Sequence, residues 1–286
     1  MLRNCFIAIA GLLCLVGCTG SKEYRADSGM VWNTFYHITY EADEDLSSDI
    51  LSALDRVEAS LSPFKQNSVI SLINRGDTLA TDSLVERILL VSQRINRLSG
   101  GAFDPTVAPL VNLWGFGYEN GSGEPTIEQL DSCKELVGIA DCRIENGMMV
   151  KKAPGTQFNF SAITKGFGSD EVGRALEERG CENYMVEIGG EIALKGVNSH
   201  GGKWRIQIDA PIDDKVTSER LTVVELSDCG IATSGNYRNY RESDSGRVGH
   251  TISPSTGRPV VTEVLSATVI APSCMEADAL ATACMA

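Results

Sequence analysis

An aspartate and a threonine stand four residues apart near the C-terminal end of the sequence. If residues 271–286 form a helix, Asp278 and Thr282 lie on one face of it. A carboxylate and a hydroxyl on one face are hard oxygen ligands, which suit Mg²⁺, an ion that keeps several of its waters. The spacing is equally compatible with an exposed aspartate beside a threonine that bonds back to its own helix. On these two residues alone, both interpretations stay open.

A lysine stands in the first turns of another predicted helix. Residues 159–168 read N-F-S-A-I-T-K-G-F-G, which is typical of a strand that runs into a helix, and they include Lys165. Free backbone N–H groups at a helix start attract anions, and a lysine there adds positive charge. The net charge of −13 excludes a general nucleic-acid surface and repels phosphate-bearing ligands, so such a ligand needs a local cation. A solvated lysine is the alternative.

Further polar and glycine-rich clusters stand at the ends of predicted elements. They are F-D-P-T at 103–106, W-G-F-G at 114–117, V-E-I-G-G-E-I at 186–192, A-T-S-G-N-Y at 232–237 and H-T-I-S-P-S-T-G-R-P at 250–259. Asp104 precedes a proline and could simply cap a helix, and the glycine pair could be a plain hairpin turn. His250 is a candidate general base because histidine titrates near neutral pH, although a lone histidine is more often structural.

Several well-known motifs are absent from the chain. It has no G-x-x-x-x-G-K-[ST] loop, no G-x-G-x-x-G and no H-E-x-x-H. Ser62 and Lys65 fit the S-x-x-K pattern of acyl-enzyme proteins, but the S-D-N and K-T-G companions are missing. The cysteines beyond residue 18 form no C-x-x-C pair, so buried thiols and disulfides both stay open.

Hydrophobic periodicity predicts the elements that must position these residues. Apolar residues at spacings of three and four predict helices over 44–61 and 81–99, and two further helices are expected over 161–179 and 271–286. Asn146-Gly147 predicts a tight hairpin. Strands are expected over 34–40, 183–188, 191–196, 204–209, 221–226, 229–233, 248–252 and 264–271. Helices first and strands later predict an α+β fold, with a mixed, largely antiparallel sheet core and flanking helices.

The N-terminus has the pattern of a lipoprotein signal. Arg3 precedes an apolar run over 6–16, which is shorter than the roughly 20 residues that a membrane-spanning helix needs, and small residues precede Cys18. We expect a signal peptide over 1–17, lipid attachment at Cys18, a polar tether over 18–29 and one domain over 30–286. The last predicted helix lacks a cap, which suggests a truncated C-terminus. The expected location is the bacterial envelope, anchored by lipid to a membrane and facing the periplasm or exterior.

Taken together and in this order, the clusters resemble the ApbE-type flavin transferases, also called FAD:protein FMN transferases. The resemblance also covers K-G-F-G-S-D at 165–170 and E-A-D-A-L-A-T at 276–282. It implies an FAD cleft between two closely packed lobes and Mg²⁺ held by Asp278, Thr282 and the backbone carbonyl of Ala162. It implies flavin contacts from Met30, Phe64, Ala102, Phe103, Asp104, Asn159, Lys165 and Ile252. Two positions depart from the family: Asn159 replaces a frequent aspartate, and Phe64 a frequent tyrosine.

The resemblance also implies an activity. FMN would pass from FAD, a substrate, to a threonine hydroxyl of an acceptor protein with release of AMP, in a reaction that needs Mg²⁺, and His250 would accept the threonine proton. Expected acceptors are envelope flavoproteins such as subunits of sodium-pumping quinone reductase or Rnf complexes. The alternatives are an Mg²⁺-dependent FAD pyrophosphatase, which yields FMN and AMP, and a non-catalytic FAD-binding lipoprotein.

Overall fold

The computed structural model describes residues 22–118, 124–211, 219–235, 240–243 and 246–286, and of residues 240–248 it describes the backbone only. The expected signal peptide and Cys18 lie outside this part of the chain. Its main sheet has six strands, and every pair of neighbours in it is antiparallel. In spatial order the strands are β1 (Glu23–Val31), β2 (Thr34–Ala42), β5 (Tyr184–Ile188), β6 (Glu191–Lys195), β9 (Cys229–Gly235) and β12 (Ser266–Ala271).

Three two-stranded ribbons and a set of helices complete the described fold. The ribbons are β3 (Arg143–Glu145) with β4 (Met148–Val150), β7 (Trp204–Asp209) with β8 (Arg220–Leu226), and β10 (Tyr240–Ser243) with β11 (Gly246–Gly249). The α-helices are α1 (Ser47–Leu61), α2 (Val69–Arg75), α3 (Ser83–Leu98), α4 (Ala108–Leu113), α5 (Ile127–Lys134), α6 (Ser161–Glu178) and α7 (Cys274–Met285). Two 3₁₀ turns are η1 (Pro105–Val107) and η2 (Ile139–Asp141).

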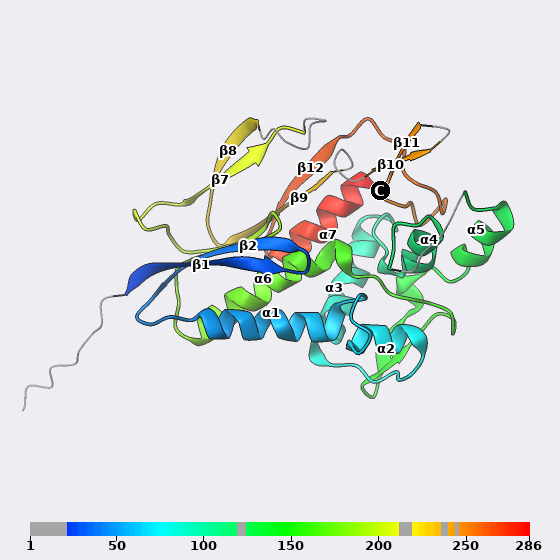
Figure 1. The fold of residues 1–286 in the computed structure, drawn as a ribbon, viewed down its shortest axis with the longest axis horizontal. Helices are drawn as coiled ribbons and strands as arrows, with labels where there is room; N and C mark the ends of the chain where they lie inside the picture. The colour runs from blue at the N-terminus through cyan, green and yellow to red at the C-terminus, as the bar shows by residue number, and fades with distance from the viewer. Residues whose placement is uncertain (1–21, 119–123, 212–218, 236–239, 244–245) are drawn as a thin grey trace, which may run out of the picture.

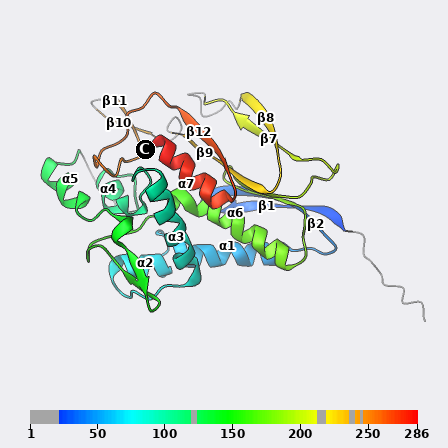
Figure 2. The same cartoon turned by 180° about the vertical axis from the view of Figure 1, so that it is seen from behind.

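Helices α6 and α7 lie at the centre of the molecule. Figure 1 shows them side by side, with α7 against β9 and β12 and with α1 on the far side of α6, and Figure 2 shows the same order from behind. One core fills the space between the sheet, α1 and α6 and includes Ile38, Ile50 and Val186. A second core lies among α1, α3 and α6 and includes Phe160 and Phe167. Because α6 borders both cores, burial of apolar surface on two sides fixes its position.

The α+β fold class is confirmed, with an antiparallel sheet and flanking helices. The helices expected over 44–61, 81–99, 161–179 and 271–286 correspond to α1, α3, α6 and α7. The expected hairpin joins β3 to β4, and both of its turn residues are left-handed, with φ 52° at Asn146 and 73° at Gly147. The strand expected over 248–252 is only partly present, since β11 ends at Gly249 and Ile252 forms a single bridge with Pro259.

The polar tether expected over residues 18–29 is wrong for residues 23–29, which belong to β1. This strand pairs with β2 along its whole length, from Glu23 opposite Ala42 to Val31 opposite Thr34. Its residues alternate between exposed and half-buried, as expected at the edge of a sheet with one face in solvent. The polarity that suggested a tether therefore belongs to an edge strand. Residues 18–21 lie outside the described part of the chain.

The described residues settle one question that the sequence left open. All six cysteines among them, Cys133, Cys142, Cys181, Cys229, Cys274 and Cys284, are free thiols, so no disulfide links the described elements. Within the same residues, every helix is too short or too polar to cross a bilayer.

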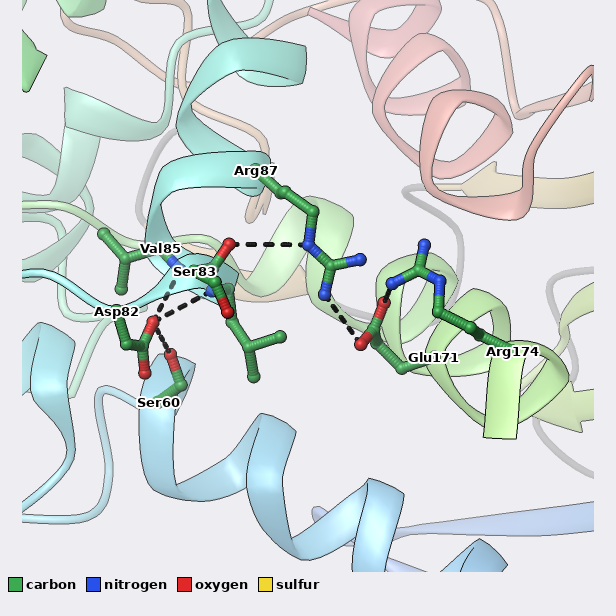
Figure 3. A network of polar contacts seen from close by, with 8 residues as sticks. Ser60, Asp82, Ser83, Val85, Arg87, Glu171 and Arg174 are labelled. Carbon is green, nitrogen blue, oxygen red and sulfur yellow. Dashed lines mark hydrogen bonds and ion pairs between the residues drawn. The ribbon is translucent and has the colours of Figure 1, made fainter. Parts of the chain in front are cut away.

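A cavity of about 530 Å³ lies among α1, α3 and α6 and is lined by charged side chains. Figure 3 shows its central network, in which the buried Glu171 carboxylate receives Arg87 at 2.7 Å and Arg174 at 2.5 Å. Asp82 caps α3 by accepting hydrogen bonds from the backbone of Leu84 and Val85. None of the predicted site residues lines this cavity. The ion pairs therefore tie α3 to α6 at a place distinct from the candidate site.

Candidate active site

The candidate site lies where α7 packs tightly against Gly166 of α6. A Cβ added at Gly166 would lie 2.7 Å from the carbonyl carbon of Cys274 and 2.8 Å from Asp278 Cβ. Such distances are well below ordinary contact, so only glycine at position 166 permits this packing. The glycine is a local sequence feature, but its packing role depends on a partner more than a hundred residues later.

Two aspartates link α6 and α7, because each helix supplies one aspartate that accepts hydrogen bonds from the backbone of the other. Asp278 of α7 is 3% exposed, and its Oδ2 accepts a hydrogen bond from the backbone N–H of Gly166 at 3.0 Å. Asp170 of α6 accepts hydrogen bonds from the backbone N–H groups of Cys274 and Met275, both at 2.9 Å, and so caps the start of α7. Burial raises the pKa of Asp170 to about 7, against the lowering effect of these two amides. Asp278 is thereby held in one position against the start of α6.

The three predicted metal ligands converge at this contact. Thr282 lies on the same face of α7 as Asp278, and its hydroxyl donates a hydrogen bond to the carbonyl oxygen of Ala162 at 3.5 Å. The Ser234 hydroxyl, from β9, lies 3.3 Å from the Thr282 hydroxyl. No described residue donates a hydrogen bond to Asp278 Oδ1. The structure therefore brings together the carboxylate, the hydroxyl and the carbonyl, and it adds Ser234, which the sequence placed only within a cluster.

Lys165 lies beside Asp278 and is paired with a carboxylate that sequence reasoning passed over. Glu191, the first residue of β6, lies 2.5 Å from the Lys165 ammonium, and its side chain is 4% exposed. Burial disfavours the charged lysine, but the charges of Asp278 and Glu191 outweigh it and raise the pKa of Lys165. Burial, together with the charge of Asp278, raises the pKa of Glu191. Burial also raises the pKa of Asp278, although Lys165 opposes this.

These residues fit a hard divalent cation. Two buried carboxylates face a single ammonium group, which leaves an uncompensated negative charge that a divalent cation would neutralise. In the described part of the chain no three His, Cys, Asp or Glu side chains gather around a common point. A metal here would thus bind one carboxylate and neutral oxygens, with water completing its shell. That ligand set suits Mg²⁺ and is poor for zinc, which prefers nitrogen and sulfur.

Two of the predicted flavin contacts also accept hydrogen bonds from backbone amides at the starts of helices. Asp104 Oδ1 accepts hydrogen bonds from the Thr106 backbone at 2.9 Å and from the Thr106 hydroxyl at 2.5 Å, and Oδ2 accepts from the Ile139 backbone at 3.1 Å. Burial raises the pKa of Asp104 against these bonds. Asn159 Oδ1 accepts from the Ser161 backbone at the start of α6. The sequence had offered a capping role for Asp104, and the structure shows one.

The remaining predicted flavin contacts differ in how exposed their side chains are. Met30 and Phe64 are 67% and 71% exposed, and Phe64 also meets the Tyr118 ring edge to face, with centroids 6.4 Å apart. Exposed apolar side chains of this kind can pack against a planar ring. Phe103 and Ile252 are buried in separate clusters, so they present little side-chain surface to any ligand. Ala102, next to Phe103, is half-buried.

His250 follows β11 and is half-buried. Two residues later, Ile252 packs with Leu110 and Trp114, and the Trp114 indole donates a hydrogen bond to the carbonyl oxygen of Gly257 at 2.8 Å. These contacts hold the segment that carries the histidine against α4. The role of His250 as a base stays a prediction.

Comparison with known proteins agrees with the resemblance. A family model described as the ApbE family matches residues 32–286. A relative from Vibrio cholerae serotype O1, described as FAD:protein FMN transferase, is 40% identical across 99% of this chain and 87% of its own length. One from Haemophilus influenzae with the same description is 37% identical across 96% of this chain and 84% of its own length.

Solved structures agree as well. The flavin transferase ApbE from Vibrio cholerae has a TM-score of 0.82 at 39% identity, over 92% of this chain and 87% of that chain. The apo form of the flavinyl transferase ApbE from Pseudomonas stutzeri has a TM-score of 0.81 at 31% identity, over 92% of this chain and 84% of that chain. The family expected from the sequence is confirmed, and the chain belongs to the ApbE family.

Proposed function

We propose that this chain is an enzyme that transfers FMN from FAD to a threonine hydroxyl of an acceptor protein, releases AMP and requires Mg²⁺. The observation that carries the proposal is the convergence of Asp278, Thr282 and the Ala162 carbonyl beside Lys165. The relatives described as FAD:protein FMN transferases support the reaction class.

In the proposed reaction the threonine oxygen attacks the phosphorus on the FMN side of the diphosphate. A phosphoester bond forms, the bond from that phosphorus to the bridging oxygen breaks, and AMP leaves with this oxygen. Bound Mg²⁺ would supply charge that neutralises the non-bridging oxygens. Lys165 would contribute a second positive charge to the diphosphate. His250 would take the proton from the threonine hydroxyl.

Positive charge at the site would offset the repulsion between this acidic chain and the diphosphate. A net charge of −13 repels a dianionic diphosphate at long range. At the site, however, Lys165 lies near the start of α6, where a bound divalent cation would add positive charge and backbone N–H groups also favour anions. Binding would therefore depend on the metal, because the protein alone supplies too little positive charge.

The test is covalent labelling of an acceptor. The mature chain is incubated with FAD, Mg²⁺ and the flavin-carrying domain of a sodium-pump or Rnf subunit, and the acceptor is examined by in-gel flavin fluorescence. We expect a fluorescent acceptor band that EDTA abolishes. Free FMN and AMP with no labelled acceptor would indicate an FAD pyrophosphatase, and intact FAD would indicate a binding protein.

Two variants in one helix sharpen this test. Asp278→Asn keeps the shape of the side chain but loses its charge, and we expect labelling to fall roughly 100-fold or more, because even indirect partners of a metal are worth 10–100-fold. Glu276→Gln is the matched control, since this carboxylate of α7 pairs instead with Arg94 of α3. It should label the acceptor at the wild-type rate. Equal labelling by both variants would remove Asp278 from the proposed site.

We also propose that the protein works in the bacterial envelope, anchored to a membrane through lipid on Cys18 and facing the periplasm or exterior. The apolar run over 6–16 and the small residues before Cys18 support this location. Cys18→Ser should move the protein from the membrane fraction to the soluble fraction of cells. A variant that stays in the membrane fraction would contradict a lipid anchor at this cysteine.

A further inference from the structure

The Glu191 carboxylate is buried at the start of β6, where Lys165 is its charged partner. Its side chain is 4% exposed, and among the described residues Lys165 is the only ion-pair partner of this carboxylate. The backbone at this position also bonds to α6, because the Ser169 hydroxyl donates to the Glu191 carbonyl oxygen at 3.1 Å. Burial of a carboxylate is costly unless its charge serves a partner. The side chain therefore acts on Lys165.

The lysine is confined along its length as well as at its tip. Gly189, with φ at 62°, precedes β6, and a Cβ there would lie 3.2 Å from Lys165 Cδ. The glycine turn thus packs along the lysine stem while Glu191 holds the ammonium group. On its other side, the neighbouring residue Gly166 binds Asp278, whose charge also acts on Lys165. Lys165 consequently stands between two buried carboxylates and is paired with Glu191.

We infer that Glu191 is a positioning residue, which holds the Lys165 ammonium away from Asp278 and so keeps the Asp278 carboxylate free for a divalent cation. The inference rests on the proposed function, because it assumes that Asp278 binds the metal. Attraction between opposite charges is strong in a buried site. Without the Glu191 charge, the ammonium would pair with Asp278 and compete with the cation for the same oxygen atoms.

The test measures metal binding without flavin. Mn²⁺, used in place of Mg²⁺, is titrated into the protein without FAD, and free Mn²⁺ is followed by electron paramagnetic resonance. For Glu191→Gln we expect Mn²⁺ affinity to fall about 10–100-fold, the usual effect of losing a residue that positions a metal site. Glu187→Gln is the matched control, because this carboxylate of β5 is partly exposed and faces His37 at 3.8 Å. It should leave the affinity unchanged.

A double variant separates positioning from simple loss of charge. If Glu191 acts by restraining the lysine, then Lys165→Met combined with Glu191→Gln should bind Mn²⁺ as tightly as Lys165→Met alone. If Glu191 acts only as a negative charge near the metal, the two effects should add and the double variant should stay weaker. Additive effects would overturn the inference. Glu191→Asp keeps the charge, so its affinity for Mn²⁺ should lie between those of Glu191→Gln and the wild type. If Glu191→Gln does not fold, Glu191→Asp takes its place in the comparison.

The outcomes also separate this inference from the proposed function. A wild-type protein that binds no Mn²⁺ would overturn the metal site, and the inference with it. A wild-type protein that binds Mn²⁺, beside a folded Glu191→Gln variant of equal affinity, would overturn the positioning role alone. In the flavin-transfer assay the same variant should show a higher KM for FAD at saturating Mg²⁺, since the lysine would no longer face the diphosphate.

Discussion

Gly166→Ala should damage the site more than it damages the fold. The added methyl carbon would lie 2.7 Å from the Cys274 carbonyl carbon and 2.8 Å from Asp278 Cβ. Ordinary contact begins near 3.4 Å, and the Cys274 carbonyl oxygen would lie closer still, so α7 would have to retreat from α6 by about 1 Å. The crowded atoms include backbone, which cannot rotate away as the end of a side chain can. Asp278 and Thr282 would therefore move with α7, away from α6.

Gly166→Ala should lower the rate of flavin transfer much more than it lowers stability. Overpacking costs about 1–3 kcal/mol, and the better helix propensity of alanine offsets up to about 1 kcal/mol of this, so the free energy of unfolding should fall by about 0–3 kcal/mol. A misplacement near 1 Å can cost about 100-fold in rate. We expect flavin transfer to fall about 10–100-fold in a protein that remains folded. Urea unfolding and single-turnover labelling of the acceptor measure the two effects.

Gly173→Ala provides the matched control in the same helix. A Cβ there would lie 2.7 Å from the Tyr184 hydroxyl oxygen, which belongs to a side chain of the sheet and not to α7. Its stability should fall by a similar amount while transfer stays at the wild-type rate. The reasoning is refuted if Gly166→Ala transfers FMN normally, or if Gly173→Ala loses as much activity as Gly166→Ala.

Three further predictions concern the same helices. Glu171→Ala should lower the free energy of unfolding by about 2 kcal/mol in urea titrations, because Arg87 and Arg174 both lose a charged hydrogen-bond partner; an unchanged midpoint would show that the network contributes nothing. Because burial raises the Asp170 pKa from 3.8 to about 7, its stabilising contribution is complete below about pH 4 and is lost as the pH rises through 7. The stability of Asp170→Asn relative to wild type should therefore increase from pH 4 to pH 7, and a pH-independent difference would contradict the shift. Thr282→Val should weaken Mn²⁺ binding about 10-fold or more while Thr282→Ser retains it; equal affinities would exclude the hydroxyl as a ligand.

The sequence predicted the elements whose signals are local and periodic. Helices α1 and α3 were expected because each has an apolar stripe at helical spacing, and two more helices were expected where the structure has α6 and α7. The shared face of Asp278 and Thr282 followed from the same periodicity. The short helices α2 and α5 were missed, since seven or eight residues give too little periodicity to recognise.

Contacts between distant segments could not be predicted in the same way. The pairing of Glu191 with Lys165 and the contact of Ser234 with Thr282 both join segments far apart in the sequence, and neither has a local pattern. Strand β1 was taken for a tether because an edge strand with one solvated face can be as polar as a linker. The resemblance to a family supplied the grouping of site residues that periodicity alone could not.

The central claim is that Asp278, Thr282 and the Ala162 carbonyl form a metal-dependent site for FMN transfer. The most direct measurement is the intact mass of an acceptor protein after incubation with this chain and FAD, at increasing Mg²⁺ concentrations. We predict that the acceptor gains the mass of one FMN less one water on a threonine, that the gain follows the Mg²⁺ concentration, and that Asp278→Asn slows it roughly 100-fold or more. An acceptor of unchanged mass in the presence of FAD and Mg²⁺, or a gain that persists in EDTA, would contradict the account.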